Sequence, residues 1–303
     1  MTGDNAAGRN PLSVFHIGNL TVSGTAARAQ QQLCAQFVDH RGRIDMPAYG
    51  VLFDDVGGIP FHLAGKESGA LSMQARLTMS AMGYVAPDDR LTAAADVEMS
   101  DEHTGVTPVR ITTGTGHLCC VGTARNMRVG RATADGTEES QAAVELPDCA
   151  GAHGVRLPEP IPAALEGRDV VAQIAAQVRE AGPLADLLNG RIEIPDASTG
   201  LRFVVDTEPW MGNFFGTMHG GVIATIIGQA FSFAGQAHAG AGRDYHLADM
   251  SLGFFRSPAV HGTQVIVEVE PVKVGRRIAS FSARMIGHDG TLLSEGVADV
   301  HYR

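Results

Sequence analysis

Residues 213–225 of this 303-residue chain read Asn-Phe-Phe-Gly-Thr-Met-His-Gly-Gly-Val-Ile-Ala-Thr and pass from a glycine-rich loop into an apolar run. Apolar and small residues continue to His238, a stretch long enough for a buried helix. The first N–H groups of a helix lack partners within it and lie at the positive end of its dipole. Glycines at that point let a ligand approach the backbone closely. The stretch therefore predicts a buried helix that begins at a binding site.

Further segments with strand and helix patterns surround this helix. Residues 169–180 are typical of a helix, and residues 190–207 contain two short strand patterns. Four strand-like runs follow the central helix, at residues 246–255, 264–274, 276–286 and 291–302. This order predicts an α+β fold in which an antiparallel sheet wraps one long helix.

The first half of the chain repeats the same order of elements. We expect strands at residues 15–22 and 27–38, a helix at 47–59 that ends or kinks at Pro60, and strands at 71–82, 90–99, 109–113 and 118–127. An offset of 174 residues aligns four small residues of the two halves: Gly42 with Gly216, Gly116 with Gly290, Gly122 with Gly296, and Ala124 with Ala298.

The repeat predicts two domains joined by a linker. Residues 133–162 are rich in small and acidic residues, proline and glycine, and they show no clear periodicity. We therefore expect an N-terminal domain at residues 1–132, with residues 1–12 flexible, a linker at 133–162 and a C-terminal domain at 163–303.

Composition excludes several classes of protein. The net charge of −10 argues against a nucleic-acid partner, which normally meets a basic surface. No apolar stretch reaches the ~18 residues of a membrane span, and the N-terminus lacks the pattern of a secretion signal. The four cysteines, at positions 34, 119, 120 and 149, show neither a CxxC pair nor metal-ligand spacing. We therefore expect a cytoplasmic protein without a metal.

The motif in residues 213–221 has the form N-x-x-G-x-x-H-G-G, which resembles the PaaI branch of the hotdog-fold thioesterases. Residues 249–259 resemble the central strand of that family and the turn after it, with Ser257 inserted. Gly275-Arg276-Arg277 resembles the start of its next strand. The resemblance is good over residues 180–303 and weak over 13–130. It implies two tandem hotdog domains and hydrolysis of an acyl-CoA thioester, with CoA as part of the substrate and no separate cofactor. The sequence leaves open the acyl group and the choice between CoA and an acyl-carrier protein.

The C-terminal half departs from the family at one decisive position. The family carries an acidic residue nine positions after the motif histidine, where this chain has Gly228. The offset of 174 leads from Gly228 to Asp54, in the sequence Val-Leu-Phe-Asp-Asp-Val-Gly-Gly at residues 51–58. Conversely, the first half has Asp39 in place of Asn213, and Pro47, which has no N–H, in place of Gly221. Each half has kept what the other has lost.

Because the sites of this family lie between two hotdog subunits, the resemblance implies one composite site within this chain. Asn213, His219, Gly220 and Gly221 would face Asp54, with Asp55 as the alternative carboxylate. A second, inactive site would pair Asp39 and Pro47 with Gly228. An offset of 175 places Ser72 where the family has a strand hydroxyl.

In the predicted mechanism the amide of Gly220 or Gly221 binds the thioester oxygen as it becomes an oxyanion. Asp54 activates water or attacks the carbonyl carbon, and the sequence leaves both routes open. His219 is more often a positioning residue than a general base at such a point. Arg276 and Arg277 are candidates to bind the CoA phosphates.

Two other functions remain open from the sequence. The loss of half of the catalytic residues is compatible with a catalytically silent protein that binds acyl-CoA. An enoyl-CoA hydratase is a further alternative, although no Asp-x-x-x-x-His string precedes a helix. We also expect two such chains to pair as a homodimer.

Overall fold

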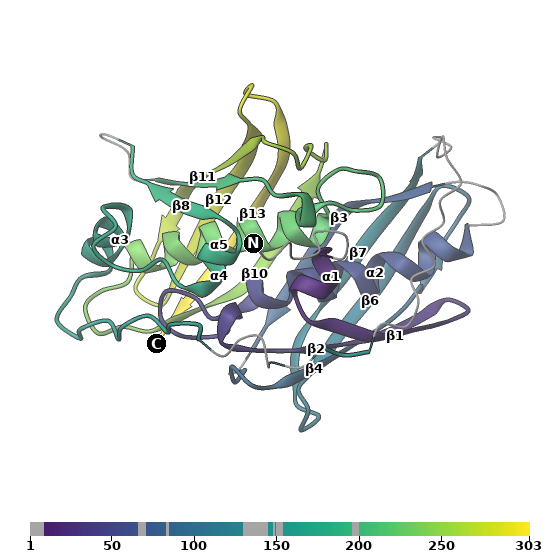
Figure 1. Cartoon of the computed structure of the whole chain (residues 1–303), viewed down its shortest axis with the longest axis horizontal. Helices are drawn as coiled ribbons and strands as arrows, with labels where there is room; N and C mark the ends of the chain where they lie inside the picture. The colour runs from purple at the N-terminus through teal and green to yellow at the C-terminus, as the bar shows by residue number, and fades with distance from the viewer. Residues whose placement is uncertain are drawn as a thin grey trace, which may run out of the picture.

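The computed structural model describes residues 9–65, 71–82, 85–129, 145–147, 149, 154–195 and 200–303. Most of the predicted linker lies outside these residues, so the predicted domain boundaries stay predictions. Within them the predicted α+β fold is confirmed: a broad antiparallel sheet packs against two long helices, α2 and α5, one over each half of the sheet (Figure 1).

The elements of the first half follow the predicted order. They are α1 (Pro11–Val14), β1 (Ile17–Ser23), β2 (Ala26–Gln32), the 3-10 turns η2 (Ala35–Phe37) and η3 (Met46–Tyr49), α2 (Gly50–Ala64), β3 (Leu71–Ala81), β4 (Arg90–Asp96), β5 (Met99–Ser100), β6 (Thr104–Thr112) and β7 (Leu118–Val129).

The second half repeats that order after two short helices. Its elements are α3 (Gly167–Ala175), α4 (Pro183–Leu187), β8 (Gly190–Glu193), β9 (Leu201–Asp206), the 3-10 turn η6 (Pro209–Met211), α5 (Gly220–Ala237), β10 (Tyr245–Phe254), β11 (Gln264–Val274), β12 (Ile278–Gly287) and β13 (Leu292–Tyr302).

The strand order makes the duplication visible in space. Twelve of the thirteen described strands follow one another in the sheet in the order β1-β2-β4-β6-β7-β3-β10-β13-β12-β11-β9-β8, and the short β5 pairs with β6 beside this path. The second half thus repeats the first in reverse order about the β3–β10 pair. The strands β10, β11, β12 and β13 each begin 174 residues after β3, β4, β6 and β7. The turn glycines obey the same offset, because Gly42 and Gly216 both have φ +75°, a conformation that favours glycine.

The offset holds for the helix starts but not along the whole of β3. Asp45 and His219, 174 residues apart, are the N-caps of η3 and α5. In β3, however, Ser72 pairs with Arg128, and in β10 Tyr245 pairs with Tyr302, so the sheet register relates β3 to β10 by 173 residues. The offset of 175 that singled out Ser72 is therefore wrong.

Helix α2 also differs from its prediction at both ends. It begins after a 3-10 turn and runs through Pro60 to Ala64, although a proline inside a helix removes one hydrogen bond. Burial of the residue after Pro60 explains the continuation. Phe61 is 1% exposed, lies close against Gly105 of β6 and has the Arg128 guanidinium over its ring. The apolar contact outweighs the lost backbone bond.

Candidate functional site

The N-terminus of α5 meets the first turns of α2 at the junction of the two halves. The N–H of Gly221 donates a hydrogen bond of 2.6 Å to Oδ2 of Asp54, 167 positions earlier in the chain. One turn further along α5, the Thr225 hydroxyl donates to the carbonyl oxygen of Pro47 at 3.0 Å. The structure thus brings Asp54, Gly220 and Gly221 together.

Glycines at positions 220 and 221 allow a close approach of the two helices. A Cβ atom on Gly221 would lie 2.5 Å from Cα of Val51, so any side chain there would push the backbones apart. A Cβ atom on Gly220 would lie 2.9 Å from the Asp54 carboxylate, so a side chain there would displace that carboxylate. The two glycines of the motif therefore serve the close approach of the halves as well as the approach of a ligand.

His219 joins the same cluster as the N-cap of α5. Its Nδ1 accepts a hydrogen bond from the N–H of Gly221 at 3.1 Å and lies 3.2 Å from Asp54 Oδ2. At this separation a proton carried by either His219 Nδ1 or Asp54 Oδ2 forms a hydrogen bond to the other atom.

Burial dominates the electrostatics of this cluster. Burial raises the pKa of Asp54 above 3.8, against the opposing effects of His219 and of the Gly221 N–H. Burial likewise lowers the pKa of His219, against the opposing effect of Asp54. Both shifts favour a neutral carboxylic acid beside a neutral imidazole when no substrate is present. Asp55 is affected most, because burial and the neighbouring Asp54 raise its pKa to about 8.

Three polar groups near this cluster have no partner within the described part of the chain. Oδ1 of Asp54 and Oδ2 of Asp55 are buried without a hydrogen bond. The N–H of Gly220, at the first position of α5, also has none. A free carboxylate oxygen and a free helix-terminal N–H thus lie beside each other, which is the pairing needed to activate a water and to bind an oxyanion.

Asn213 belongs to the loop before α5. Its Oδ1 accepts from the N–H groups of Phe215 and Thr217, at 2.9 and 3.2 Å, and from the Thr217 hydroxyl. The side-chain oxygen therefore shapes the loop that carries the motif, and the structure records no hydrogen bond between Asn213 and Asp54.

Ser72 and the two arginines lie elsewhere. The Ser72 hydroxyl is 3.3 Å from Nδ1 of His62, two turns beyond Asp54 on α2. The backbone of Arg277 binds Tyr302, whose hydroxyl donates to Gly235 near the far end of α5. That is about 22 Å along the helix from Gly220, at 1.5 Å per residue. The structure therefore does not bring Ser72, Arg276 or Arg277 to the carboxylate.

Arg256 is a cation nearer to the motif that the sequence analysis did not select. It is exposed and lies two residues before Pro258, whose carbonyl oxygen accepts from the N–H of Met218 at 2.8 Å. The sequence of residues 249–259 resembles the family pattern, but it gives no sign of this backbone bond.

The predicted inactive site has the expected composition. Pro47 stands opposite Gly228, where an added Cβ would lie 3.0 Å from the proline ring. Asp39 is buried and paired with Arg41 at 2.5 Å, and Arg41 also pairs with Asp45 at 2.7 Å. Neither a free N–H at position 47 nor a carboxylate at position 228 is available there.

The cysteines form one disulfide, between Cys34 and Cys149, which are 115 positions apart. Cys119 and Cys120 are buried free thiols. Among the described residues one group of potential metal ligands lies within 4.8 Å, namely His16 with the same two cysteines, whose sulfur atoms are bonded to each other.

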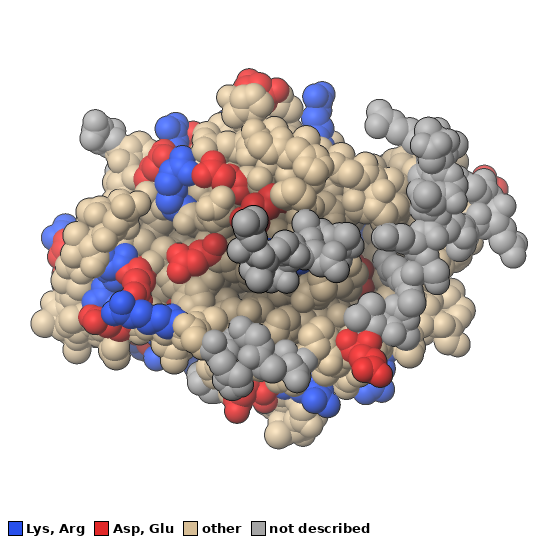
Figure 2. Space-filling model, viewed as in Figure 1, with Lys and Arg blue, Asp and Glu red and all other residues tan. Residues whose placement is uncertain are grey.

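Two surface properties complete the description. None of the helices in the described ranges is long and apolar enough to cross a membrane. On the face shown in Figure 2, acidic and basic side chains of the described residues are interspersed, mostly over the C-terminal half.

Part of the chain matches a known sequence family. Residues 215–294 match the sequence model of a family described as the thioesterase superfamily. A search of curated protein sequences found no match. The family match begins at Phe215, within the motif loop, and covers α5 and most of the following strands. It supports thioester hydrolysis in general.

Solved structures match nearly the whole chain. A hotdog-fold protein of unknown function from Alicyclobacillus acidocaldarius is 11% identical, with a TM-score of 0.58 over 94% of this chain and 95% of that one. An acyl-ACP thioesterase from Bacteroides thetaiotaomicron is 9% identical, with a TM-score of 0.54 over 93% and 100%. The 12:0-ACP thioesterase from Umbellularia californica is 9% identical, with a TM-score of 0.54 over 92% and 95%. The predicted hotdog fold and the resemblance to hotdog-fold thioesterases are thereby confirmed.

Proposed function

We propose that this chain, whose two halves share the hotdog fold, is a PaaI-type thioesterase that hydrolyses an acyl-CoA thioester in the cytoplasm. The reaction takes place at the single composite site between its halves. The observation that carries the proposal is the bond between the Gly221 N–H and Asp54. It joins the glycine motif of one half to the only helix carboxylate that the duplication has retained at this pair of positions.

The oxyanion site in this proposal is the N-terminus of α5. The N–H of Gly221 already binds Asp54, so the unpartnered N–H of Gly220 is the donor for the thioester oxygen. Charge that develops on this oxygen in the transition state lies at the positive end of the helix dipole. The site costs no reorganisation, because the helix holds the N–H in place before the substrate binds.

Asp54 provides the base or the nucleophile. Its Oδ1 is buried and unpartnered, so it can take a proton from a water molecule or attack the carbonyl carbon itself. Either route needs the ionised carboxylate. Because burial raises the pKa of Asp54, activity should fall as the pH drops through that raised pKa. His219 holds the second carboxylate oxygen and acts as a positioning residue.

The phosphates of CoA require a cation near the entrance of the site. Arg256 fits this role better than Arg276 or Arg277, because its segment is hydrogen-bonded to the motif loop. Replacement of Arg256 by Ala should raise KM for acyl-CoA several-fold with little change in kcat, as expected for a contact made equally in the ground state and the transition state.

The first experiment measures thiol release from acyl-CoAs of short, medium, long and aromatic acyl groups. Wild type is compared with Asp54→Asn and with Asp55→Asn, a matched change of the neighbouring buried carboxyl that does not contact Gly221. We expect turnover by wild type and by Asp55→Asn, and its loss in Asp54→Asn. Turnover that survives in Asp54→Asn would contradict the composite site.

A catalytically silent acyl-CoA-binding protein is the second candidate. The observation in its favour is that Asp54 occupies the Gly221 N–H, which leaves one free donor for an oxyanion. No thiol release by any variant, together with a Tm raised by CoA ligands, would establish this candidate. Sedimentation of the purified protein would test the predicted homodimer.

A further inference from the structure

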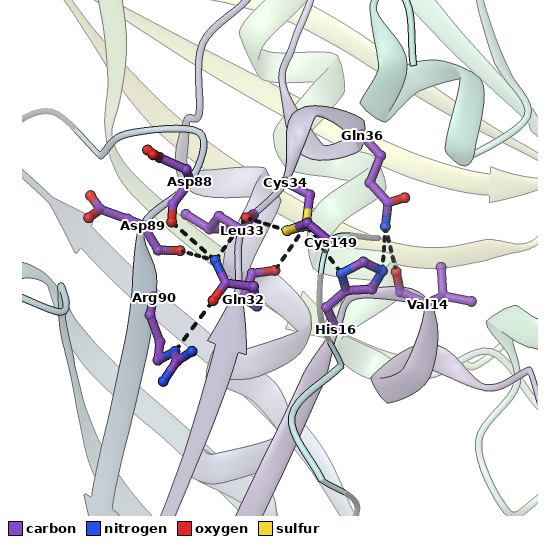
Figure 3. The surroundings of a disulfide bond; sticks show 10 residues. All are labelled: Val14, His16, Gln32, Leu33, Cys34, Gln36, Asp88, Asp89, Arg90 and Cys149. Atoms are coloured by element: carbon purple, nitrogen blue, oxygen red, sulfur yellow. Dashed lines mark hydrogen bonds between the residues drawn. A yellow bond between two sulfur atoms is a disulfide. The ribbon is translucent and has the colours of Figure 1, made fainter. Parts of the chain in front are cut away.

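A second group of reactive side chains lies in the first half and shares no residue with the proposed thioester site. Figure 3 shows Cys34, which follows β2, bonded to Cys149 of the segment that connects the halves. The imidazole of His16, just before β1, has its Nδ1 3.3 Å from Cys34 Sγ.

The hydrogen bonds of Gln36 fix the proton of this histidine. The Gln36 amide nitrogen lies 3.2 Å from the carbonyl oxygen of Val14, which identifies it as the donor end of the amide. The same nitrogen lies 3.1 Å from His16 Nε2, which must therefore accept. A neutral imidazole that accepts at Nε2 carries its proton at Nδ1, and this N–H faces Cys34 Sγ.

The two sulfur atoms of the disulfide have different surroundings. Cys34 is 3% exposed, whereas Cys149 is only partly buried. Cys34 Sγ faces the His16 N–H at 3.3 Å and has the carbonyl oxygen of Gln32 at 3.8 Å, whereas Cys149 Sγ has the carbonyl oxygen of Leu33 at 3.2 Å. Both sulfur atoms have a carbonyl oxygen nearby, but a donor, which stabilises a thiolate, faces Cys34, so Cys34 is the better leaving group and Cys149 the more accessible sulfur.

We propose that Cys34, Cys149 and His16 form a site of reversible thiol–disulfide exchange with a small monothiol of the glutathione type, in which Cys149 is attacked and Cys34 leaves. Gln36 is a positioning residue, because it sets the proton of His16. This inference does not depend on the proposed thioesterase function.

The exchange balances in two steps. A thiolate bonds to Cys149 Sγ while the bond to Cys34 breaks, and the electron pair leaves with Cys34 Sγ, which the His16 N–H holds as a thiolate. A second thiolate then attacks the small thiol's sulfur in the mixed disulfide and frees Cys149. Two small thiols have become one disulfide, and their two electrons have reduced the protein pair. Oxidised thiol in excess drives the reverse reaction.

The test traps the intermediate in the full-length protein. Oxidised protein is mixed with limiting reduced glutathione, alkylated under native conditions, quenched with acid and digested for mass spectrometry. We expect the glutathione adduct on Cys149 and the alkyl group on Cys34. Cys119 and Cys120 are buried, and burial raises the pKa of Cys119 to about 11, so both should resist alkylation in the folded protein and report that the fold is intact.

Two variants test the role of the imidazole without straining the backbone. His16 has φ +52°, which glycine and asparagine adopt more readily than other residues. His16→Gly should slow reduction by glutathione on the order of threefold to tenfold, because the leaving group loses its donor. His16→Asn keeps an N–H donor and should stay within about twofold of wild type.

Several outcomes would overturn the proposal. An adduct on Cys34 with Cys149 alkylated would reverse the assigned roles. Equal rates for wild type and His16→Gly would remove the histidine from the reaction. Quantitative alkylation of both cysteines in unreduced, denatured protein would show that the disulfide does not form. Retention of one zinc ion per reduced chain would show that the three side chains serve a metal instead.

Discussion

The two equivalent ends of the α2–α5 contact show how one duplicated site became two different structures. At one end Gly221 gives its N–H to Asp54. At the other end the equivalent positions are Pro47, which has no N–H, and Gly228, which has no side chain, and they meet by contact alone. A pair of identical subunits would have to keep both elements in every copy. A fused pair needs each element only once, which explains the complementary losses.

The loops before the two helices have kept their shape while their chemistry diverged. Asn213 Oδ1 accepts from the N–H groups two and four positions later, and Asp39 Oδ1 does the same with Arg41 and Arg43. Burial alone would raise the pKa of Asp39, but the Arg41 guanidinium beside it lowers that pKa. The predicted inactive site is thus held together by a buried ion pair.

We expect the largest difference between the two ends to follow from removal of the Asp54 carboxylate. Asp54→Asn keeps the shape and one acceptor for Gly221 but cannot act as base or nucleophile. We expect kcat to fall about 10³-fold, within the range for loss of a general base, as measured by thiol release. Circular dichroism is the control and should show that the variant is folded like wild type. A fall in activity that came from unfolding would say nothing about the chemical role of Asp54.

Arg41→Met tests the opposite end. Its side chain is 6% exposed and pairs with Asp39 and Asp45, so the variant leaves two buried carboxylates without a cation. We expect a loss of about 3–5 kcal/mol in the free energy of unfolding in urea, with kcat of the folded protein unchanged. A fall in kcat without a loss of stability would mean that the lost site still takes part in the reaction.

Gly220→Ala tests whether activity depends on the close approach of the α5 N-terminus to Asp54. The new Cβ would lie 2.9 Å from the Asp54 carboxylate and displace it from the N–H groups. We expect kcat to fall about 10²-fold, as for loss of an oxyanion donor. Gly58→Ala in α2 is the matched control, because its Cβ would meet only Asn126 Oδ1 at 3.8 Å. This control should keep full activity and lose no stability.

Asp55→Asn distinguishes Asp55 from the neighbouring Asp54 through the pH dependence of the free energy of unfolding. In the folded protein the pKa of Asp55 is raised to about 8, whereas the unfolded chain ionises near 3.8. Wild type therefore loses stability as the pH rises from about 4 through 8, and the variant does not. We expect the variant to gain about 1–3 kcal/mol relative to wild type between pH 5 and pH 8.5. If the free energy of unfolding changed with pH in the same way for both proteins, Asp55 would ionise in the folded protein as it does in the unfolded chain.

Ser72→Ala should have the smallest effect. The hydroxyl contacts His62 and not Asp54, so we expect kcat to change by less than about twofold, the range of a surface hydrogen bond. A fall of tenfold or more would mean that substrate binding brings Ser72 to the carboxylate.

Much of the fold and part of the site could be predicted from the sequence. The offset of 174 aligned the strands and helix caps because duplicated elements keep their spacing, and it selected Asp54 over Asp55. The offset of 175 placed Ser72 wrongly, because pairing with β7 and β13 relates β3 to β10 by 173 residues. Both strands carry the same irregularity, between Gln74 and Arg76 and between Leu247 and Asp249, so the difference lies in the pairing of distant strands and not in the local sequence.

The sequence by itself determined the α+β order, the buried helix after the motif and the division of the proposed site residues between the halves, because these follow from hydrophobic periodicity and from residue types that the proposed chemistry requires. Tertiary structure alone decided three further features. It carried α2 past Pro60, since burial of Phe61 outweighs one hydrogen bond. It separated Arg276 and Arg277 from Asp54 by most of the length of α5. It also brought Cys34 to Cys149, because contacts between residues 115 positions apart are set by how the chain closes and not by any local pattern.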